Sequence, residues 1–263
     1  VLTRWGAFRL DDGRDLDLAL TGDAGPPATT RVLDLDEPAR AYTFVDVPRA
    51  PVPSLARGYS APVRVEFNYT DDELALLAAH DSDPYSRWDA AQRTWALAIR
   101  ALAAGRRAGR PPALPPGLLR VVAALLDDRT SDPALVALAL SLPDPLYVAA
   151  GDAVIDVEGI DHARSFVVRE LARALPGRFE RAYHAQARTG PYAPVAAQIA
   201  RRRLANVCLR YLAGRGDAAC ALSSAQRAGI WHDQRDDMLR SRHMNKHTDS
   251  ADTSDATPGW RDR

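Results

Sequence analysis

The sequence predicts a multidomain, mainly α protein in which a partial antiparallel β-sandwich is followed by an all-α helical array. Residues 1–69 hold short alternating segments, residues 70–228 repeat a helical pattern, and residues 229–263 contain few aliphatic side chains. Alternation of apolar and polar residues is typical of half-buried strands, whereas apolar residues three and four apart are typical of amphipathic helices. We therefore expect a β domain, an α-helical domain and a tail with these boundaries.

Turn residues divide the first 69 residues into about five candidate strands. Asp12-Gly13 separates two alternating segments of "FRLDDGRDLDLAL" and predicts a hairpin, because glycine tolerates a positive φ. "TRVLDLD", "AYTFVDV" and the alternating residues 63–69 are further candidate strands. The segment "PRAPVPSLARGYSAP" is expected to be an extended edge or a connection, since proline cannot donate a hydrogen bond to a sheet.

The two patterns meet within "VRVEFNYTDDELALL", residues 63–77. Thr70 and Glu73 form a Thr-x-x-Glu capping box, which predicts the start of a helix directly after the last candidate strand. This abrupt change of period predicts a domain boundary at residue 70.

Capping signals also place the later helices. Helix starts are predicted at Asp83-Pro84, Asp132-Pro133 and Asp144-Pro145. The Asp side chain caps the first turn, and proline is tolerated there because the backbone N–H that it lacks has no partner within the helix. The first of these helices is predicted to end at Gly105 and to bury one face made of Trp88, Ala91, Trp95, Ala98 and Leu102. Further helices are predicted at about 117–126, 133–142, 157–175, 178–187, 194–213 and 217–228, with Gly214 after the longest late helix.

The composition is that of a globular protein, with 46% apolar and 26% charged residues. A formal net charge of zero gives no electrostatic case for nucleic acid or an anionic membrane as a partner. No apolar run approaches the roughly 20 residues that span a bilayer, and "VLTRWGAFRL" has no secretory pattern, so a cytoplasmic location is expected. Cys208 and Cys220 are predicted to be reduced, buried thiols, and Val1 in place of Met predicts that the chain begins inside a longer one.

The histidines were the first candidates for a site. His243 and His247 have the spacing of a zinc-binding helix, but Met244 stands where a catalytic Glu would be, so we interpret the pair as a coincidence in the tail. His162 and His184 are predicted to lie on helix surfaces or at the edge of the core.

Charged clusters have structural interpretations as well. Arg201, Arg202, Arg203 and Arg210 are predicted to form a solvated helix face, with RNA or phosphate binding as the alternative. Asp71-Asp72 and Asp127-Asp128 fall at helix ends, where carboxylates are favourable. The sequence has no glycine-rich phosphate loop and no Gly-x-Ser-x-Gly motif. The sequence thus predicts no catalytic, cofactor-binding or metal-binding residue.

Residues 44–92, "FVDVPRAPVPSLARGYSAPVRVEFNYTDDELALLAAHDSDPYSRWDAAQ", resemble bacterial aminopeptidase N, a family of zinc metallopeptidases of the gluzincin type. The family has a Pro-Val-Pro-Ser-Leu and Gly-(Phe/Tyr)-Ser-Ala-Pro-Val stretch, then His-Asp-Ser-Asp-Pro-(Phe/Tyr)-x-Arg-Trp-(Glu/Asp)-Ala. Later landmarks are Asp132-Pro133-Ala134-Leu135, "VIDVEGIDHAR" and "NVCLRYLA", and the resemblance runs from about residue 9 to 215. It implies an Ig-like sandwich followed by a helical domain.

The resemblance also implies what lies outside this sequence. The family binds zinc with His-Glu-x-x-His and a distal Glu, binds the substrate amine with Gly-Ala-Met-Glu-Asn, and uses a Tyr for the oxyanion. None of the six histidines precedes Glu, and the only methionines, Met238 and Met244, lie in "DDMLR" and "RHMNK". We therefore expect no cofactor and no activity in this chain, with zinc and peptide substrates only in the full-length family.

The implied role is a scaffold and a lid, with the catalytic domain of the same, usually monomeric, enzyme as the partner. The sequence departs from the family at both ends, which predicts an incomplete sandwich and a disordered or frameshifted tail. Such a fragment would expose a sheet edge and apolar helix faces that favour aggregation. The alternatives are a stand-alone helical protein-interaction module and an arginine-mediated nucleic-acid binder.

Overall fold

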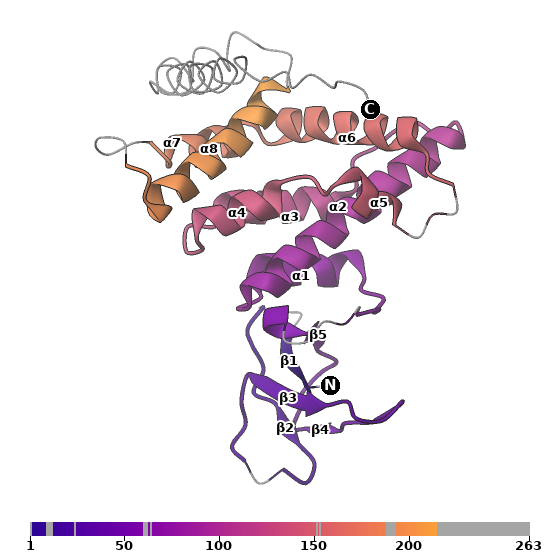
Figure 1. Cartoon of the computed structure of the whole chain (residues 1–263), viewed down its shortest axis with the longest axis vertical. Helices are drawn as coiled ribbons and strands as arrows, with labels where there is room; N and C mark the ends of the chain where they lie inside the picture. Colours follow the sequence, from indigo (N-terminus) through magenta and orange to yellow (C-terminus); the bar gives the residue numbers. More distant parts are fainter. Residues whose placement is uncertain are drawn as a thin grey trace, which may run out of the picture. The chain divides into compact units, whose positions relative to one another are not determined.

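The computed structural model describes residues 2–8, 13–23, 25–59, 63, 65–150, 152, 154–187 and 193–214. Contacts divide the chain into two units, Val1–Gly216 and Asp217–Arg263, and all the described residues belong to the first. Figure 1 colours the chain from the indigo strands at its beginning to the orange helix that ends near residue 213. The predicted helix at 217–228 and the predicted tail lie outside the described residues.

Five strands precede the helices. β1 (Leu2–Phe8), β3 (Thr30–Asp34) and β5 (Val52–Leu55) form an antiparallel sheet in the order β3-β1-β5. In the register of this sheet, Trp5 of β1 lies opposite Arg31 of β3 and Leu55 of β5. β2 (Ala19–Leu20) and β4 (Phe44–Val45) form a second, two-stranded antiparallel sheet. The proline-rich segment thus supplies β5, an edge strand, as the sequence predicted.

One strand prediction is wrong, and another falls largely outside the described residues. β1 pairs with β3 and β5, and the residues between Phe8 and Gly13, where a hairpin across Asp12-Gly13 is predicted, are outside the described ranges. Gly13 has a positive φ, of 66°. Residues 65–69 do not belong to a strand, and their bonds include Tyr69 Oη to Pro53 O at 2.9 Å and Tyr69 N–H to Phe67 O at 3.2 Å. Alternation indicates an extended backbone, but it does not name the pairing partner.

The helices follow in short steps, and their bounds match most of the predicted ones. A 3-10 turn, η1, covers Arg57–Tyr59. The helices are α1 (Asp71–His80), α2 (Pro84–Arg107), α3 (Pro116–Asp127), α4 (Pro133–Leu140), α5 (Pro145–Ala149), α6 (Val157–Ala174), α7 (Pro176–His184) and α8 (Ala196–Ala213).

Local capping explains where these helices begin. The Thr70–Glu73 capping box is confirmed, with Glu73 N–H donating to Thr70 Oγ1 at 3.2 Å and Thr70 N–H donating to Glu73 Oε2 at 2.7 Å. The side chains of Asp83, Asp132 and Asp144 cap α2, α4 and α5 as predicted. Each helix start therefore follows from a few neighbouring residues.

The predicted end of α2 is wrong by two residues. Gly105 is buried inside the helix, which continues to Arg107, and the chain turns at Gly109 with a φ of 66°. Gly109 N–H donates to Arg106 O at 3.0 Å and Arg110 N–H donates to Gly105 O at 2.9 Å, so the last carbonyls of the helix are bonded beyond Gly105.

α2 lies at the centre of the helical array and packs against α1, α3, α4, α5 and α6. Trp95 is fully buried on α2 and donates from Nε1 to Ala139 O at 2.9 Å, which joins α2 to α4. At the other side of α4, Tyr211 of α8 donates from Oη to Leu140 O at 2.9 Å and stacks on Phe179 at 4.6 Å. The core is thus apolar, with two aromatic side chains that bind backbone carbonyls.

Candidate functional site at the junction of strands and helices

The most polar buried cluster lies where η1 meets the turn between α1 and α2. Arg57 is 4% exposed, Asp81 is 2% exposed and Ser54 is 1% exposed. Charged side chains are almost never buried to this extent without a partner. The cluster therefore depends on mutual hydrogen bonding, and we call these three residues with Asp15 and Ser82 the Arg57 cluster.

An unusual backbone turn presents Arg57 to the helices. Ala56, Gly58 and Tyr59 all have positive φ angles, of 53°, 66° and 49°. Non-glycine residues with such angles are uncommon and persist where surrounding contacts fix them. The left-handed backbone on both sides of Arg57 directs its side chain into the protein rather than into solvent.

The guanidinium of Arg57 contacts residues from both structural parts. Nε donates to Ser54 Oγ at 3.0 Å, and Nη1 donates to Thr30 Oγ1 at 2.7 Å. Nη2 donates to Asp81 Oδ1 and to Asp15 Oδ1, both at 3.0 Å, and to Ser82 Oγ at 3.2 Å. The planar fork of arginine suits such a set of acceptors.

Asp81 is the corresponding residue on the helical side. It is the C-cap of α1, and its carboxylate accepts from Ser54 Oγ at 2.6 Å and from Asp83 N–H at 2.8 Å in addition to Arg57. Burial raises the pKa of the Asp81 carboxyl above its ordinary value, and these hydrogen bonds and the Arg57 charge oppose that effect. The base that Ser54 contacts is the Asp81 carboxylate, and this carboxylate is also bound to Arg57 and to Asp83 N–H, which suits a structural role better than the activation of a nucleophile.

A second connection runs parallel to the first. Asp83 caps α2 by accepting from Ser86 N–H at 2.9 Å, and the same oxygen accepts from Gly58 N–H at 3.0 Å. His80 packs on Gly13, where a Cβ would lie 2.6 Å from the His80 ring. The turn between α1 and α2 is thus held against the strand region at three places.

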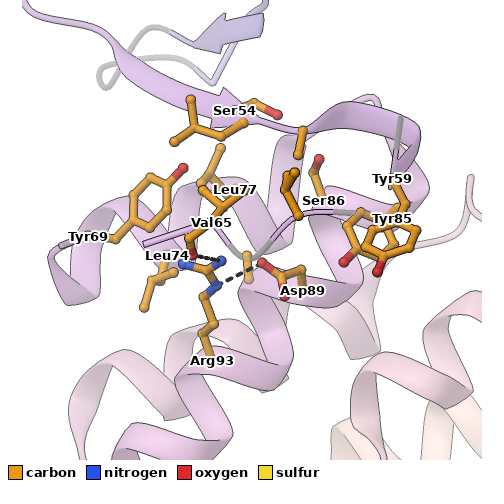
Figure 2. A pocket seen from close by; sticks show the side chains of 14 residues that line it. Ser54, Tyr59, Val65, Tyr69, Leu74, Leu77, Tyr85, Ser86, Asp89 and Arg93 are labelled. Atoms are coloured by element: carbon orange, nitrogen blue, oxygen red, sulfur yellow. Dashed lines mark hydrogen bonds and ion pairs between the residues drawn. The ribbon is translucent and has the colours of Figure 1, made fainter. Parts of the chain in front are cut away.

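A small pocket opens beside the cluster (Figure 2). Its volume is about 50 Å³, enough for one or two waters but not for a peptide. Asp89 and Arg93 form an ion pair of 2.7 Å at its floor, and Arg93 also donates to Val65 O at 3.3 Å. Burial raises the pKa of Tyr69 and of Asp89. Tyr59 and Tyr85 also line the pocket, with ring centres 5.1 Å apart.

A broader groove of about 1070 Å³ lies between the α1–α2 turn and the α3–α4 turn. Two of the carboxylates that line it are paired: Asp128 with Arg87 at 2.7 Å, and Asp127 with Arg178 at 2.8 Å. Burial of Asp128 acts to raise its pKa, but hydrogen bonds from Ser131, Thr130 and Arg87 outweigh it and hold the pKa well below its usual range. The Arg87–Asp128 pair joins α2 to the turn after α3 and therefore has a structural role beside the groove.

Among the described residues, the candidates considered from the sequence are not brought together. His162 is exposed on α6, with Nδ1 2.9 Å from Glu158 O, and His184 is exposed at the end of α7. Arg201, Arg203 and Arg210 are exposed on α8. Cys208 is buried with a free thiol, and burial raises its pKa to about 12. Cys220, His243 and His247 lie outside the described residues.

Within the described ranges, no group of three or more His, Cys, Asp or Glu side chains is placed to hold a metal ion. The helices that the structure describes are all too short or too polar to cross a bilayer.

Arg57 and Asp81 are not among the candidates that the sequence predicts, although both stand in the segments that carry the resemblance. The signal that could have identified them is the charge pattern: one arginine in "PVPSLARGYS", where the other residues are small or apolar, and an Asp directly after a helix in "HDSDP". A single charge in an otherwise apolar segment requires a partner when it is buried.

Both the strand region and the helical region of the chain match known protein families. Residues 71–249 match the family described as "Domain of unknown function (DUF3458_C) ARM repeats", and residues 14–68 match "Domain of unknown function (DUF3458) Ig-like fold". The first match extends beyond residue 228, and the predicted domain boundaries stay predictions. Together the matches confirm a mainly α protein with a small antiparallel, Ig-like β part.

The named relatives are aminopeptidases, in agreement with the resemblance seen in the sequence. Aminopeptidase N of Escherichia coli is 35% identical over 182 residues, which are 69% of this chain and 21% of the relative, and that of Haemophilus influenzae is 31% identical over the same shares. A crystal structure of Legionella pneumophila aminopeptidase A with aspartic acid matches 82% of this chain and 24% of its own, with a TM-score of 0.63. At 23% identity this last likeness shows the fold alone.

The chain spans about a fifth of the length of the curated relatives that it matches. The family match covers well over half of the chain, and the strand region before it matches the companion Ig-like family. The chain therefore belongs to the family of DUF3458_C ARM-repeat domains and is homologous to the C-terminal region of aminopeptidase N.

Proposed function

We propose that this chain is the non-catalytic scaffold and lid of an aminopeptidase N-like zinc metallopeptidase that removes N-terminal residues from peptides. The strand region would brace the catalytic domain of the same enzyme, and the helical array would cover the active-site chamber. The observation that carries the proposal is the buried Arg57–Asp81 contact of 3.0 Å. It joins the two segments that carry the resemblance, so these segments have a structural role in uniting two parts.

The donor set of the described residues does not fit zinc. Among the described residues no three His, Cys, Asp or Glu side chains converge, and none of the six histidines in the sequence precedes a Glu. Zinc in peptidases needs three protein ligands and an open position. We therefore assign the zinc site and the bound peptide to the remainder of the enzyme, and we place that enzyme in the cytoplasm as a monomer.

A chimera tests the proposal. The 182 residues of Escherichia coli aminopeptidase N that match this chain are replaced by the matching residues of this chain, and zinc content and hydrolysis of alanine p-nitroanilide are measured. We expect a folded, zinc-loaded and active chimera. The Escherichia coli enzyme with the same residues deleted is the control, and it should lose solubility or activity.

The chain on its own completes the test. We expect no hydrolysis of alanine p-nitroanilide with or without added zinc. Activity that a chelator abolishes, or a folded chimera that lacks zinc and activity, would overturn the proposed function.

One observation favours a second candidate, a helical protein-interaction module. Leu146, Val154 and Val157, on α5, before α6 and at its first residue, are 73%, 79% and 70% exposed. Large apolar groups exposed to this extent mark interaction sites where they form one patch. In the chimera these residues would become protected from hydrogen exchange if they face the rest of the enzyme, and they would stay unprotected if they serve an external partner.

A further inference from the structure

We propose that the Arg57 cluster is an ionic latch that fixes the orientation of the strands relative to helices α1 and α2. The bonds of the guanidinium divide into two sets. Thr30 and Ser54 come from the sheet and Asp15 from the loop before β2, whereas Asp81 and Ser82 come from the turn between α1 and α2. One planar group therefore holds both parts.

Because Arg57 and Asp81 are both buried, even a partial separation of this ion pair is costly. The side chains of Arg57 and Asp81 are 5% and 0% exposed. Removing one member of a buried ion pair leaves an uncompensated charge, which is far more costly than losing an exposed pair. The strands cannot tilt away from α1 without separating these two charges, and this cost suppresses intermediate orientations.

Gly6 on β1 makes room for the latch. A Cβ at this position would lie 2.4 Å from Cζ and 2.5 Å from Nε of Arg57. The guanidinium cannot move aside cheaply, because its nitrogens are committed to both sets of acceptors. Substitution of Gly6 by Ala therefore displaces the latch while leaving every charge in place.

Arg31 provides a matched control on the same sheet. It is 13% exposed in its side chain, pairs with Asp23 at 2.9 Å, and donates to Leu18 O and Pro26 O. All of these partners belong to the strand region. Loss of Arg31 should weaken that region without changing its attachment to the helices.

The experiment measures the distance between two spin labels in the full chain. Labels are attached after Glu37→Cys in the exposed loop before β4 and Arg106→Cys near the end of α2, in a Cys220→Ser background, since Cys208 is buried. We expect one narrow distance distribution. With Arg57→Ala the width should increase about twofold, because relative motion is the default for parts without a large fixed interface. With Arg31→Ala it should stay unchanged.

Two further variants keep the test decisive where Arg57→Ala does not fold. Gly6→Ala keeps the guanidinium but displaces it, and Arg57→Lys keeps the positive charge but removes the planar fork. Both variants should broaden the distance distribution. An unchanged width in the folded variants, or equal broadening with Arg31→Ala, would overturn the latch. Melting temperatures give a second readout: the losses from Arg57→Ala and Asp81→Ala should sum to more than the loss in the double variant, and additive losses would also overturn it.

Discussion

The hydroxyl of Tyr211 offers a sharp test of how the late helices are joined. Tyr211 on α8 is 1% exposed, and its Oη donates to Leu140 O at the end of α4, 71 residues earlier. Tyr211→Phe removes this single bond while keeping the ring and its stacking on Phe179. The change therefore isolates one polar contact between two helices.

The expected cost follows from burial. A net intramolecular hydrogen bond contributes roughly 1 kcal/mol, and a buried acceptor left without its donor costs about 1–3 kcal/mol. Because Leu140 is 0% exposed, water cannot replace the lost donor without opening the contact between α4 and α8. We expect a loss of about 2 kcal/mol in the free energy of unfolding.

Urea unfolding followed by tryptophan fluorescence measures this loss. Tyr147→Phe is the matched control, since Tyr147 is 45% exposed and the same substitution there should change stability by under about 0.5 kcal/mol. Equal stability of the Tyr211→Phe and Tyr147→Phe variants would refute the reasoning, because it would mean that the buried carbonyl needs no partner.

Three further outcomes are expected. The pKa of Asp128 is held below its ordinary value by hydrogen bonds that outweigh burial. The stability that the Asp128 carboxylate contributes is therefore complete above the unfolded pKa of about 3.9 and is lost as pH falls below that value towards the folded pKa. With Asp128→Asn, the free energy of unfolding should depend less steeply on pH in the acid range, as measured by circular dichroism. Thr70→Ala removes the capping box and should cost about 1 kcal/mol in urea unfolding, whereas Thr70→Ser should cost less. Burial raises the pKa of Cys208 to about 12, so its thiol should react with a disulfide reagent only after unfolding, and rapid reaction in the folded chain would contradict the buried position.

The helices were predictable because their signals are local. The Asp-Pro starts at residues 83, 132 and 144 and the capping box at Thr70 need only the residues of one turn, and each is present in the structure. The strands were less predictable, because pairing depends on residues far apart: β1 joins β3 and β5, which lie more than 20 residues further along the chain. An alternating pattern in residues 63–69 could not reveal that this segment lacks a strand partner.

The sequence predicts a boundary at residue 70, within residues 44–92 that carry the resemblance, but it does not predict the chemistry found there. In the structure Arg57 binds Asp81, 24 positions further along the chain. Neither residue belongs to a motif with a known chemical task, so only the folded arrangement shows that they are partners. Capping and periodicity describe neighbours within a turn, whereas a buried ion pair depends on the meeting of two separate segments.

The length of α2 gives its first turn mechanical importance. The helix has 24 residues, and at about 1.5 Å per residue it is roughly 36 Å long. Its first turn is bound to Gly58 through Asp83, while its later turns carry Ile99 into a cluster with Val148 and Ile160. A tilt of only about 5° at the first turn would displace the opposite end by about 3 Å, comparable to a hydrogen-bond length. A small movement of the strands would thus produce a larger displacement of the part of α2 that packs against α5 and α6.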